Sequence, residues 1–448
     1  MKHYKDIFPI FLLVLLLGSA AFLVYSNMSQ SSEYTQTLEK ARTFAKSGVV
    51  ADAEKAYQQA LNLNPSLDLS LEAGNVYLHS GEKDAAAQWA QDTVLNNYPN
   101  SSGAYEFAIQ AYLAQKDYKK AFLEYSIFQK RGLASPKVEK LIDTVRYAYS
   151  LEDSYDAVGP FANDTGLAAV CSDGKWGYVN ASGQEKVGCQ YAAAGCYSAG
   201  LAPVKDADGT AYYIDESGNK KVVASYFTSQ NAGMGNITQF SMAQQDLLLV
   251  CAGGKWSYCD TKTYRKKFGD YSAATLITNG VGAVSESGSG WSLISGGGKK
   301  ISGEVYEKIL ADEKNVICRG GAVLAQKDGT YYLLNTKGQK ISNSAYDDAK
   351  PFYSDEAAAV RKAGKWIFVD GKGKESNFGD YDDARSFSNG FAAVCRSGRW
   401  GYINSSGKLV ISYTFSDAGA FNSKGTAFVK TDSGKWQLLR LYSKNFSD

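Results

Sequence analysis

Histidine is almost absent from this chain of 448 residues, which contains only His3 and His79. Every residue after position 79 therefore lacks the side chain that most often transfers protons near neutral pH and binds zinc. This scarcity lowers the expectation of a hydrolytic triad or a zinc enzyme. We expect a non-enzymatic protein with no catalytic, cofactor-binding or metal-binding residues.

An excess of charge is also lacking, because 48 Lys+Arg stand against 46 Asp+Glu. The few basic dipeptides form no stripe, so we expect no nucleic-acid partner. Proline is scarce, with 7 residues, whereas glycine reaches 44 and tyrosine 31. This balance favours many tight turns between aromatic-rich strands.

Cysteine is sparse and scattered, and no CxxC pair occurs among Cys171, Cys189, Cys196, Cys251, Cys259, Cys318 and Cys395. An odd, dispersed set argues against a full disulfide framework. Three of these residues, at 171, 251 and 395, each lie five positions before a tryptophan. We expect them to be small buried residues in equivalent places, not bridge partners.

One long uncharged run, "IFPIFLLVLLLGSAAFLVY", covers residues 7–25. As a helix it would be about 28 Å long, close to the thickness of a bilayer's hydrocarbon core. Lys2 and Lys5 precede it, and no basic residue follows before Lys40. The positive-inside rule then predicts a single-pass membrane protein with residues 1–6 cytoplasmic and the rest extracytoplasmic. A signal peptide cleaved near "SAA" at 19–21 is the alternative.

Residues 32–150 show helical character, with apolar residues three and four positions apart. Ala41, Phe44, Gly48, Ala53 and Tyr57 begin a pattern whose offsets recur at Gly74, Tyr77, Gly81, Ala86 and Ala90, and more loosely from Ile109, where Lys116 replaces the turn glycine. This pattern resembles the tetratricopeptide repeat, and residues 136–150 would form a capping helix. The resemblance implies an all-α stack that binds a protein partner. A simple spacer remains the alternative.

A second repeat covers residues 151–448, in which "KWGYVN" at 175–180 and "RWGYIN" at 399–404 are the clearest copies. The tryptophan position of the repeat falls at 176, 211, 256, 291, 331, 366, 400 and 436, although Ala211 and Tyr331 replace the tryptophan. Eight copies at this spacing indicate a repeat array.

Each copy contains short strands separated by glycine-bearing turns. Trp400 and Tyr402 should share one face of a strand, and Gly401 should let a neighbouring sheet approach closely. Four short strands per copy predict an all-β domain, a β-propeller of about eight blades. An open β-solenoid is the alternative.

The tryptophan–glycine copies resemble the WG-repeat family over about residues 154–445. The resemblance implies a binding or scaffold role without naming a ligand, so the ligand-binding residues stay unknown. We interpret the conspicuous repeat residues as structural core rather than as a row of ligand-stacking platforms; they are Trp176, Gly177, Trp256, Trp291, Trp366, Trp400, Gly401 and Trp436.

Two further patterns suggest other functions. The acidic clusters at 346–349 and 380–384 contain Asp348 and Asp383, which a carboxylate-dependent hydrolase could use. They occupy one repeat position, so turn or strand-end chemistry explains them more simply. The hairpins "GTAYYIDESG" and "GTYYLLNTKG" resemble cell-wall-binding repeats and suggest an envelope glycan. The sequence thus favours a membrane-anchored scaffold for a protein partner, with a glycan binder second and a hydrolase a distant third.

Overall fold

The computed structural model describes residues 31–442, apart from 232, 236 and 245. These residues form two compact units, one ending at Ala148 and one beginning at Tyr149. The expected cytoplasmic start, residues 1–6, and the expected membrane segment, residues 7–25, lie outside the described residues. Among the helices that are described, none has the length and apolarity needed to span a membrane.

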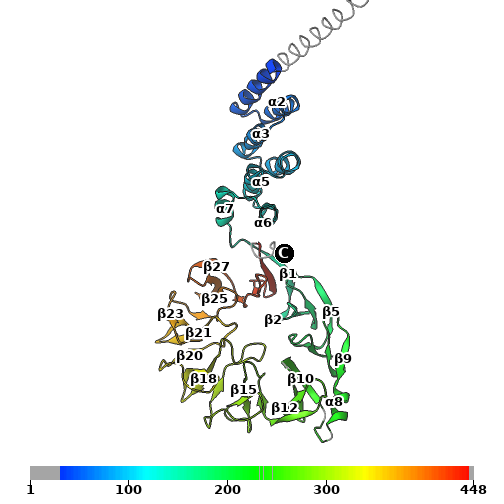
Figure 1. The fold of residues 1–448 in the computed structure, drawn as a ribbon, viewed down its shortest axis with the longest axis vertical. Coiled ribbons are helices and arrows are strands. Elements are labelled where there is room, and N and C mark those ends of the chain that lie inside the picture. Colours follow the sequence, from blue (N-terminus) through cyan, green and yellow to red (C-terminus); the bar gives the residue numbers. More distant parts are fainter. Residues whose placement is uncertain (1–30, 232, 236, 245, 443–448) are drawn as a thin grey trace, which may run out of the picture. The chain divides into compact units, whose positions relative to one another are not determined.

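The first unit is helical, which confirms the expectation of an N-terminal helical region (Figure 1). Residues 31–46 are helical, and they are followed by α2 (Val50–Leu63), α3 (Leu67–Ser80), α4 (Lys83–Trp89), the π-helical η1 (Ala90–Leu95), α5 (Ser102–Gln115), α6 (Tyr118–Lys130) and α7 (Pro136–Asp143). Consecutive helices from α2 onward contact each other, and α5 also contacts α3 and α7. This arrangement is that of stacked helix hairpins.

A glycine stands where α3 and α5 pack closely, and the turns after these two helices share one backbone shape. A Cβ on Gly74 of α3 would lie 2.3 Å from the Phe107 ring of α5, so a larger residue would force the two helices apart. Gly81 follows α3 in the left-handed conformation, with φ of 83°. Lys116 follows α5 with φ of 63°, so the turn keeps its shape although glycine is missing there.

The helical unit is shorter than the sequence predicted. The last helix, α7, ends at Asp143, and Tyr149 and Ser150 already belong to strand β1 (Tyr149–Tyr155). Their backbones pair with Leu441 and Arg440, at the other end of the second unit. This long-range pairing outweighs the local helical character of residues 136–150.

The second unit contains, within its described residues, eight antiparallel sheets, which we number as blades 1 to 8. Blade 1 contains β2 (Ala157–Phe161), β3 (Ala168–Ser172), β4 (Lys175–Val179) and β5 (Glu185–Tyr191), and blade 2 contains β6 (Ala193–Ala194), β7 (Ala202–Lys205), β8 (Ala211–Ile214) and β9 (Lys220–Val223). Blade 3 contains β10 (Ile237–Gln244), β11 (Leu247–Ala252), β12 (Lys255–Asp260) and β13 (Lys266–Tyr271), and blade 4 contains β14 (Ala273–Ala274), β15 (Val281–Ser285) and β16 (Ser292–Ser295).

Blade 5 contains β17 (Lys308–Ile309), β18 (Ala322–Lys327) and β19 (Thr330–Asn335), and blade 6 contains β20 (Asp348–Ala349), β21 (Ala357–Lys362), β22 (Lys365–Asp370) and β23 (Glu375–Ser376). Blade 7 contains β24 (Asp383–Ala384), β25 (Phe391–Arg396), β26 (Arg399–Asn404) and β27 (Leu409–Phe415). Blade 8 combines β28 (Asp417–Ala418), β29 (Thr426–Lys430) and β30 (Trp436–Leu441) with β1. A short helix, α8 (Ala224–Gln230), lies between β9 and β10.

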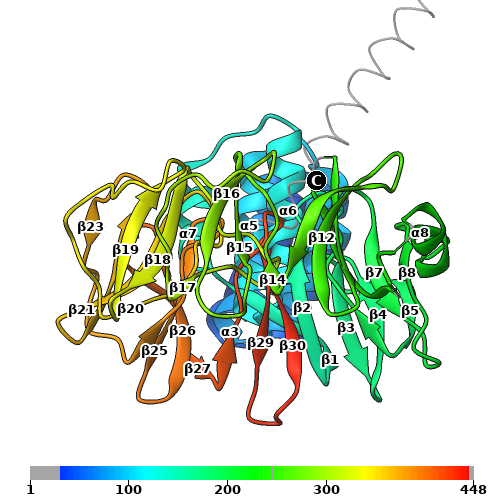
Figure 2. The same ribbon diagram turned by 90° about the horizontal axis from the view of Figure 1, so that it is seen from below.

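The ring is closed by its two ends. Strand β1 pairs antiparallel with β30, with Tyr155 opposite Trp436. Phe161 of blade 1 stacks on Phe428 of blade 8 with ring centroids 5.0 Å apart. The unit is therefore an eight-bladed β-propeller, seen as a ring in Figure 1 and from its edge in Figure 2. The alternative of an open solenoid is wrong, because the first strand of the domain pairs with its last strand and closes the ring.

Blades and sequence copies correspond one to one. Each tryptophan position lies on the third strand of a blade, or directly before it in the case of Trp291. Helix α8 falls in the 45-residue interval from Ala211 to Trp256. The 40-residue interval from Trp291 to Tyr331 contains a loop at 310–321, which is longer than the matching loop at 385–390 in blade 7.

Candidate functional site

The tryptophans of the repeat pack between blades. Trp366 and Trp400 are buried, and the others in the propeller, Trp176, Trp256, Trp291 and Trp436, are half-buried. The indole of Trp366 in blade 6 packs with Tyr381 and Ala384 of blade 7. Its Nε1 donates a hydrogen bond to the Asp382 carbonyl at 3.2 Å. This burial favours the packing role over a row of stacking platforms.

The glycine after the tryptophan has a different role from the one expected. A Cβ on Gly401 would lie 2.5 Å from the Ile411 carbonyl oxygen, and one on Gly177 would lie 2.5 Å from that of Val187. Both contacts belong to the outer strand of the same blade, where the register shifts at a bulge. The glycine accommodates this bulge, so the expectation of a neighbouring sheet was wrong.

In blade 3 the glycine is on the outer strand instead of the third strand. Ser257 replaces the glycine after Trp256, and its partner in the register is Gly269 of the outer strand. A Cβ on Gly269 would lie 2.3 Å from the Ser257 hydroxyl oxygen. In this copy, too, one of the two paired residues is a glycine, although the repeat has lost the glycine after its tryptophan.

In blades 1, 3 and 7, the tyrosine two positions after the tryptophan connects its blade to the next one. The hydroxyl groups of Tyr178, Tyr258 and Tyr402 donate hydrogen bonds of 2.8, 2.6 and 2.9 Å to the carbonyls of Gly195, Thr275 and Gly419. Each acceptor is the first residue after the inner strand of the following blade. The tyrosine therefore fixes the base of the loop that begins there. Sequence reasoning missed this role, although the tyrosine recurs in the frame.

Replacing Tyr402 with phenylalanine should destabilise the propeller by about 1–2 kcal/mol, because the part-buried Gly419 carbonyl loses its donor. Urea unfolding followed by tryptophan fluorescence reports this unit, since six of the seven tryptophans lie in it. Tyr226→Phe is the control, because Tyr226 is 46% exposed. An equal effect of the two substitutions would contradict the inter-blade role.

The acidic clusters serve as caps. The first aspartate of each pair accepts a hydrogen bond from a hairpin amide: Asp382 from Ser397 at 2.5 Å and Asp347 from Gly364 at 3.4 Å. The second aspartate, Asp348 or Asp383, accepts one from the amide of its own next residue at 2.8 Å. These are the hydrogen bonds expected of aspartates at turns and strand ends.

Two cavities open at the face where inner strands connect to second strands. The first has a volume of about 630 Å³ and is lined mainly by the connecting loops of blades 1, 5, 6, 7 and 8. The second has a volume of about 520 Å³ and is lined mainly by those of blades 1, 2, 4, 5 and 6. They share five residues, namely Asn163, Asp164, Lys314, Arg319 and Asp355.

The long loop of blade 5, residues 310–321, separates these cavities; we call it the crossing loop. Lys314 Nζ donates a hydrogen bond of 2.7 Å to Asn163 Oδ1 of blade 1, which stands opposite blade 5 in a ring of eight. The loop also bonds to blade 4, where the Asn315 carbonyl accepts a 2.9 Å bond from the Leu276 amide. Burial lowers the pKa of Lys314. The crossing loop therefore passes over the centre of the ring.

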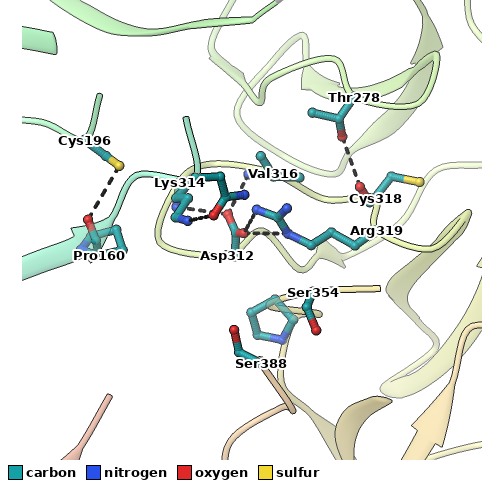
Figure 3. A network of polar contacts seen from close by, with 12 residues as sticks. Pro160, Cys196, Thr278, Asp312, Lys314, Val316, Cys318, Arg319, Ser354 and Ser388 are labelled. Atoms are coloured by element: carbon teal, nitrogen blue, oxygen red, sulfur yellow. Dashed lines mark hydrogen bonds and ion pairs between the residues drawn. The ribbon is translucent and has the colours of Figure 1, made fainter. Parts of the chain in front are cut away.

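Asp312 holds the crossing loop in shape (Figure 3). Its Oδ1 accepts the amides of Lys314 and Val316 at 2.9 and 3.0 Å. Its Oδ2 accepts Nε and Nη2 of Arg319 at 3.0 and 2.6 Å. The side chains of Asp312 and Arg319 are only 4% and 15% exposed, so this is a largely buried ion pair whose carboxylate accepts four hydrogen bonds.

The next residue, Glu313, faces the larger cavity with a side chain that is 55% exposed. Burial by the surrounding wall raises the pKa of its carboxyl group, and Arg385 opposes this increase. Arg385 bonds instead to Asp417, with Nη2 to Oδ1 at 2.7 Å, and its other Nη lies 3.9 Å from Glu313. Tyr353 lines the same wall, and burial raises its pKa to about 12.

The cysteines behave as expected of small buried residues. All seven are free, and Cys171, Cys251 and Cys395 are buried in their blades. Cys196 lies near the cavities, where its thiol donates to the Pro160 carbonyl at 3.6 Å. Burial raises its pKa to about 12, so the thiol stays protonated at neutral pH.

The aromatic hairpins that suggested glycan binding do not offer open platforms. Tyr212, Tyr213 and Tyr331 are buried. The ammonium group of Lys220 lies 3.7 Å from the Tyr212 ring centroid, and that of Lys340 lies 3.3 Å from the Tyr332 ring centroid. These lysines cover the rings that a sugar would need to stack on.

Five segments of the propeller match the WG containing repeat family, at residues 154–176, 176–209, 333–366, 379–400 and 400–436. The predicted WG repeats are thereby confirmed. No curated protein shows significant sequence similarity to this chain.

Solved structures resemble the propeller more distantly. BamB from Moraxella catarrhalis is 11% identical, with 66% of this chain and all of that chain covered, at a TM-score of 0.38. The C-terminal WD40 domain of Sif2 is 8% identical, with 65% and 98% covered, at 0.40, and the WD40 β-propeller domain of Doa1 is 11% identical, with 65% and 97% covered, at 0.34. These values are too low to carry a functional argument, so the ring of blades is established by its own strand pairings.

Proposed function

We propose that this WG-repeat propeller is a non-enzymatic scaffold that binds a protein partner at the cavity-bearing face. The observation that carries the proposal is the pair of cavities, whose walls come from the loops of seven blades. A surface assembled from many loops on a rigid ring can be shaped for one partner, as loops on other rigid scaffolds are. Protein interfaces also combine such fixed polar groups with aromatic walls.

The helical unit supplies a second docking surface in this proposal. Its stacked hairpins, with Gly74 and Gly81 where the tetratricopeptide pattern places them, support a repeat of that type. Leu123 of α6 is 45% exposed and offers an apolar contact. We also propose that residues 7–25 anchor the chain in a cell membrane, with both units on the extracytoplasmic side.

Photo-crosslinking in the native envelope tests which face binds. A benzophenone amino acid would replace Ser423, which lines the larger cavity, or Ser433, which is exposed in the β29–β30 hairpin. Because successive antiparallel strands turn at alternate ends, these two serines lie at opposite ends of the strands of blade 8, and so on opposite faces of the ring. A third position, Leu123, reports the helical unit.

We expect one protein to crosslink from position 423 and none from position 433, with the product identified by mass spectrometry. Crosslinking from 433 alone, or from 123 alone, would contradict binding at the cavity face. An envelope glycan bound to the propeller would contradict the protein partner, and it stays the alternative prediction. Measurable hydrolysis lost in Asp348→Asn or Asp383→Asn would contradict the non-enzymatic proposal.

A further inference from the structure

Glu313 lines the larger cavity and has a single, long ion pair there, with Arg385 Nη1 at 3.9 Å. Asp312 accepts four hydrogen bonds, and Asp417 accepts one from Arg385. Among the described residues, Glu313 accepts no hydrogen bond, and its nearest cation is 3.9 Å away. Its side chain is nonetheless 55% exposed to the cavity, so a ligand can reach it.

Four cations line the larger cavity, of which Lys424 is exposed in the β28–β29 loop and the other three are held in the wall. Arg319 is bonded to Asp312, Arg385 to Asp417, and Lys314 to the amide oxygen of Asn163. An anionic ligand could bind these three only by breaking these bonds, and it would approach three carboxylates. A cationic ligand would break none of them and would gain a charge-assisted hydrogen bond to Glu313.

Two carboxylates at the rim add to the negative charge of Glu313, whereas Lys424 is the exposed cation that lines the larger cavity. Asp164 and Asp355 line both cavities, and both are exposed. The Asp164 carboxylate accepts the amides of Thr165 and Gly200 at 2.9 and 3.2 Å, and that of Asp355 accepts the Gly320 amide at 2.6 Å. No cation pairs with either carboxylate within the described residues. Two such charges at the entrance attract a cation over distances of about a Debye length.

From this arrangement we propose that the larger cavity receives a lysine or arginine side chain of the partner protein, with Glu313 as its carboxylate. This inference rests on the proposed protein-binding function and names the chemistry of the partner. A cavity of about 630 Å³ has room for a long basic side chain and adjacent backbone. The aromatic wall at Tyr353 suits the aliphatic stem of such a side chain.

Terminally blocked tripeptides provide the probe, namely acetyl-Gly-Arg-Gly-amide and its citrulline equivalent, which keeps the shape but lacks the charge. Dissociation constants would be measured by NMR titration against the purified full-length chain. We expect the arginine peptide to bind roughly tenfold more tightly than the citrulline peptide. Glu313→Gln should remove this difference, whereas Glu216→Gln, in an exposed turn of blade 2, should preserve it.

Glu313→Lys is the second variant, and it should reverse the preference in favour of acetyl-Gly-Glu-Gly-amide. Thermal unfolding shows whether both variants remain folded. Equal binding of the arginine and citrulline peptides to the unmodified chain would overturn the proposal, as would an undiminished preference in Glu313→Gln. Crosslinking from position 423 is read separately, so loss of the cation site and loss of the scaffold function give different results.

Binding of the arginine peptide should also depend on pH. The groups facing Glu313 are Tyr353 of blade 6, Arg385 of blade 7, Asp417 of blade 8, and Asp312 and Lys314 of its own loop. Burial raises the carboxyl pKa of Glu313, so the ionised form is lost as pH falls through this raised value. Affinity should therefore fall at a higher pH than for an ordinary glutamate. A pH-independent affinity between neutral and acidic conditions would overturn the role of Glu313.

Discussion

Gly401→Ala should destabilise the propeller by about 3 kcal/mol, the upper part of the range for overpacked interiors. The added Cβ would lie 2.5 Å from the Ile411 carbonyl oxygen and 2.9 Å from the carbonyl carbon of Ser412. These are backbone atoms of the paired outer strand, so no side-chain rotation can relieve the contact. The strand must move away or the bulge must be lost.

Gly296→Ala is the matched control for this substitution. Gly296 follows strand β16, and a Cβ there would meet no atom within 4 Å. The expected change in unfolding free energy is within about 0.5 kcal/mol, as for an open surface position. Both variants would be unfolded in urea with tryptophan fluorescence as the signal. Similar midpoints for the two would show that the bulge does not require glycine.

The blades were predictable from the sequence, whereas the closure of the ring was less so. The spacing of Trp176, Trp400 and their equivalents predicted eight blades, because every blade solves the same packing problem. The closure of the ring was harder to predict, because it depends on the pairing of β1 with β30, which are at opposite ends of the domain's sequence. A pairing between residues 149 and 441 leaves no pattern in the sequence around either residue, so the local sequence places Tyr149 in the helical unit.

The candidate site was less accessible to sequence reasoning. Repeats identify what blades have in common, whereas a binding site depends on what differs between them. Residues 312–319 lie in the crossing loop of blade 5, outside the repeat frame, and their only trace in the sequence is the 40-residue interval before Tyr331. The contact of Lys314 with Asn163 connects positions 151 apart in the chain, which no spacing argument predicts.

The repeat and the site are nevertheless connected physically. Tyr402 of blade 7 bonds to the Gly419 carbonyl, and Gly419 lines the larger cavity. The motif tyrosine therefore positions a loop that forms part of the cavity wall. A regular core of this kind lets the loops of one face vary while their starting points stay fixed.

Asp312→Ala should have the largest effect, about 3–5 kcal/mol, because it leaves the Arg319 charge buried without its partner. It also removes the acceptor of the Lys314 and Val316 amides, on which the shape of the crossing loop depends. We therefore expect the urea midpoint to fall and the arginine tripeptide to lose its affinity together. Asp328→Asn is the control, since Asp328 is exposed in a hairpin turn and has φ of 53°, which asparagine adopts readily.

A double variant separates the buried charge from the lost loop contacts. Asp312→Ala combined with Arg319→Met removes both charges, so it should be more stable than Asp312→Ala alone. The two backbone amides remain without an acceptor in both variants, which leaves a deficit of about 1–3 kcal/mol relative to the unmodified chain. If the double variant is as unstable as the single one, the charge of Arg319 is solvated in the folded state and the crossing loop depends on its amide contacts alone.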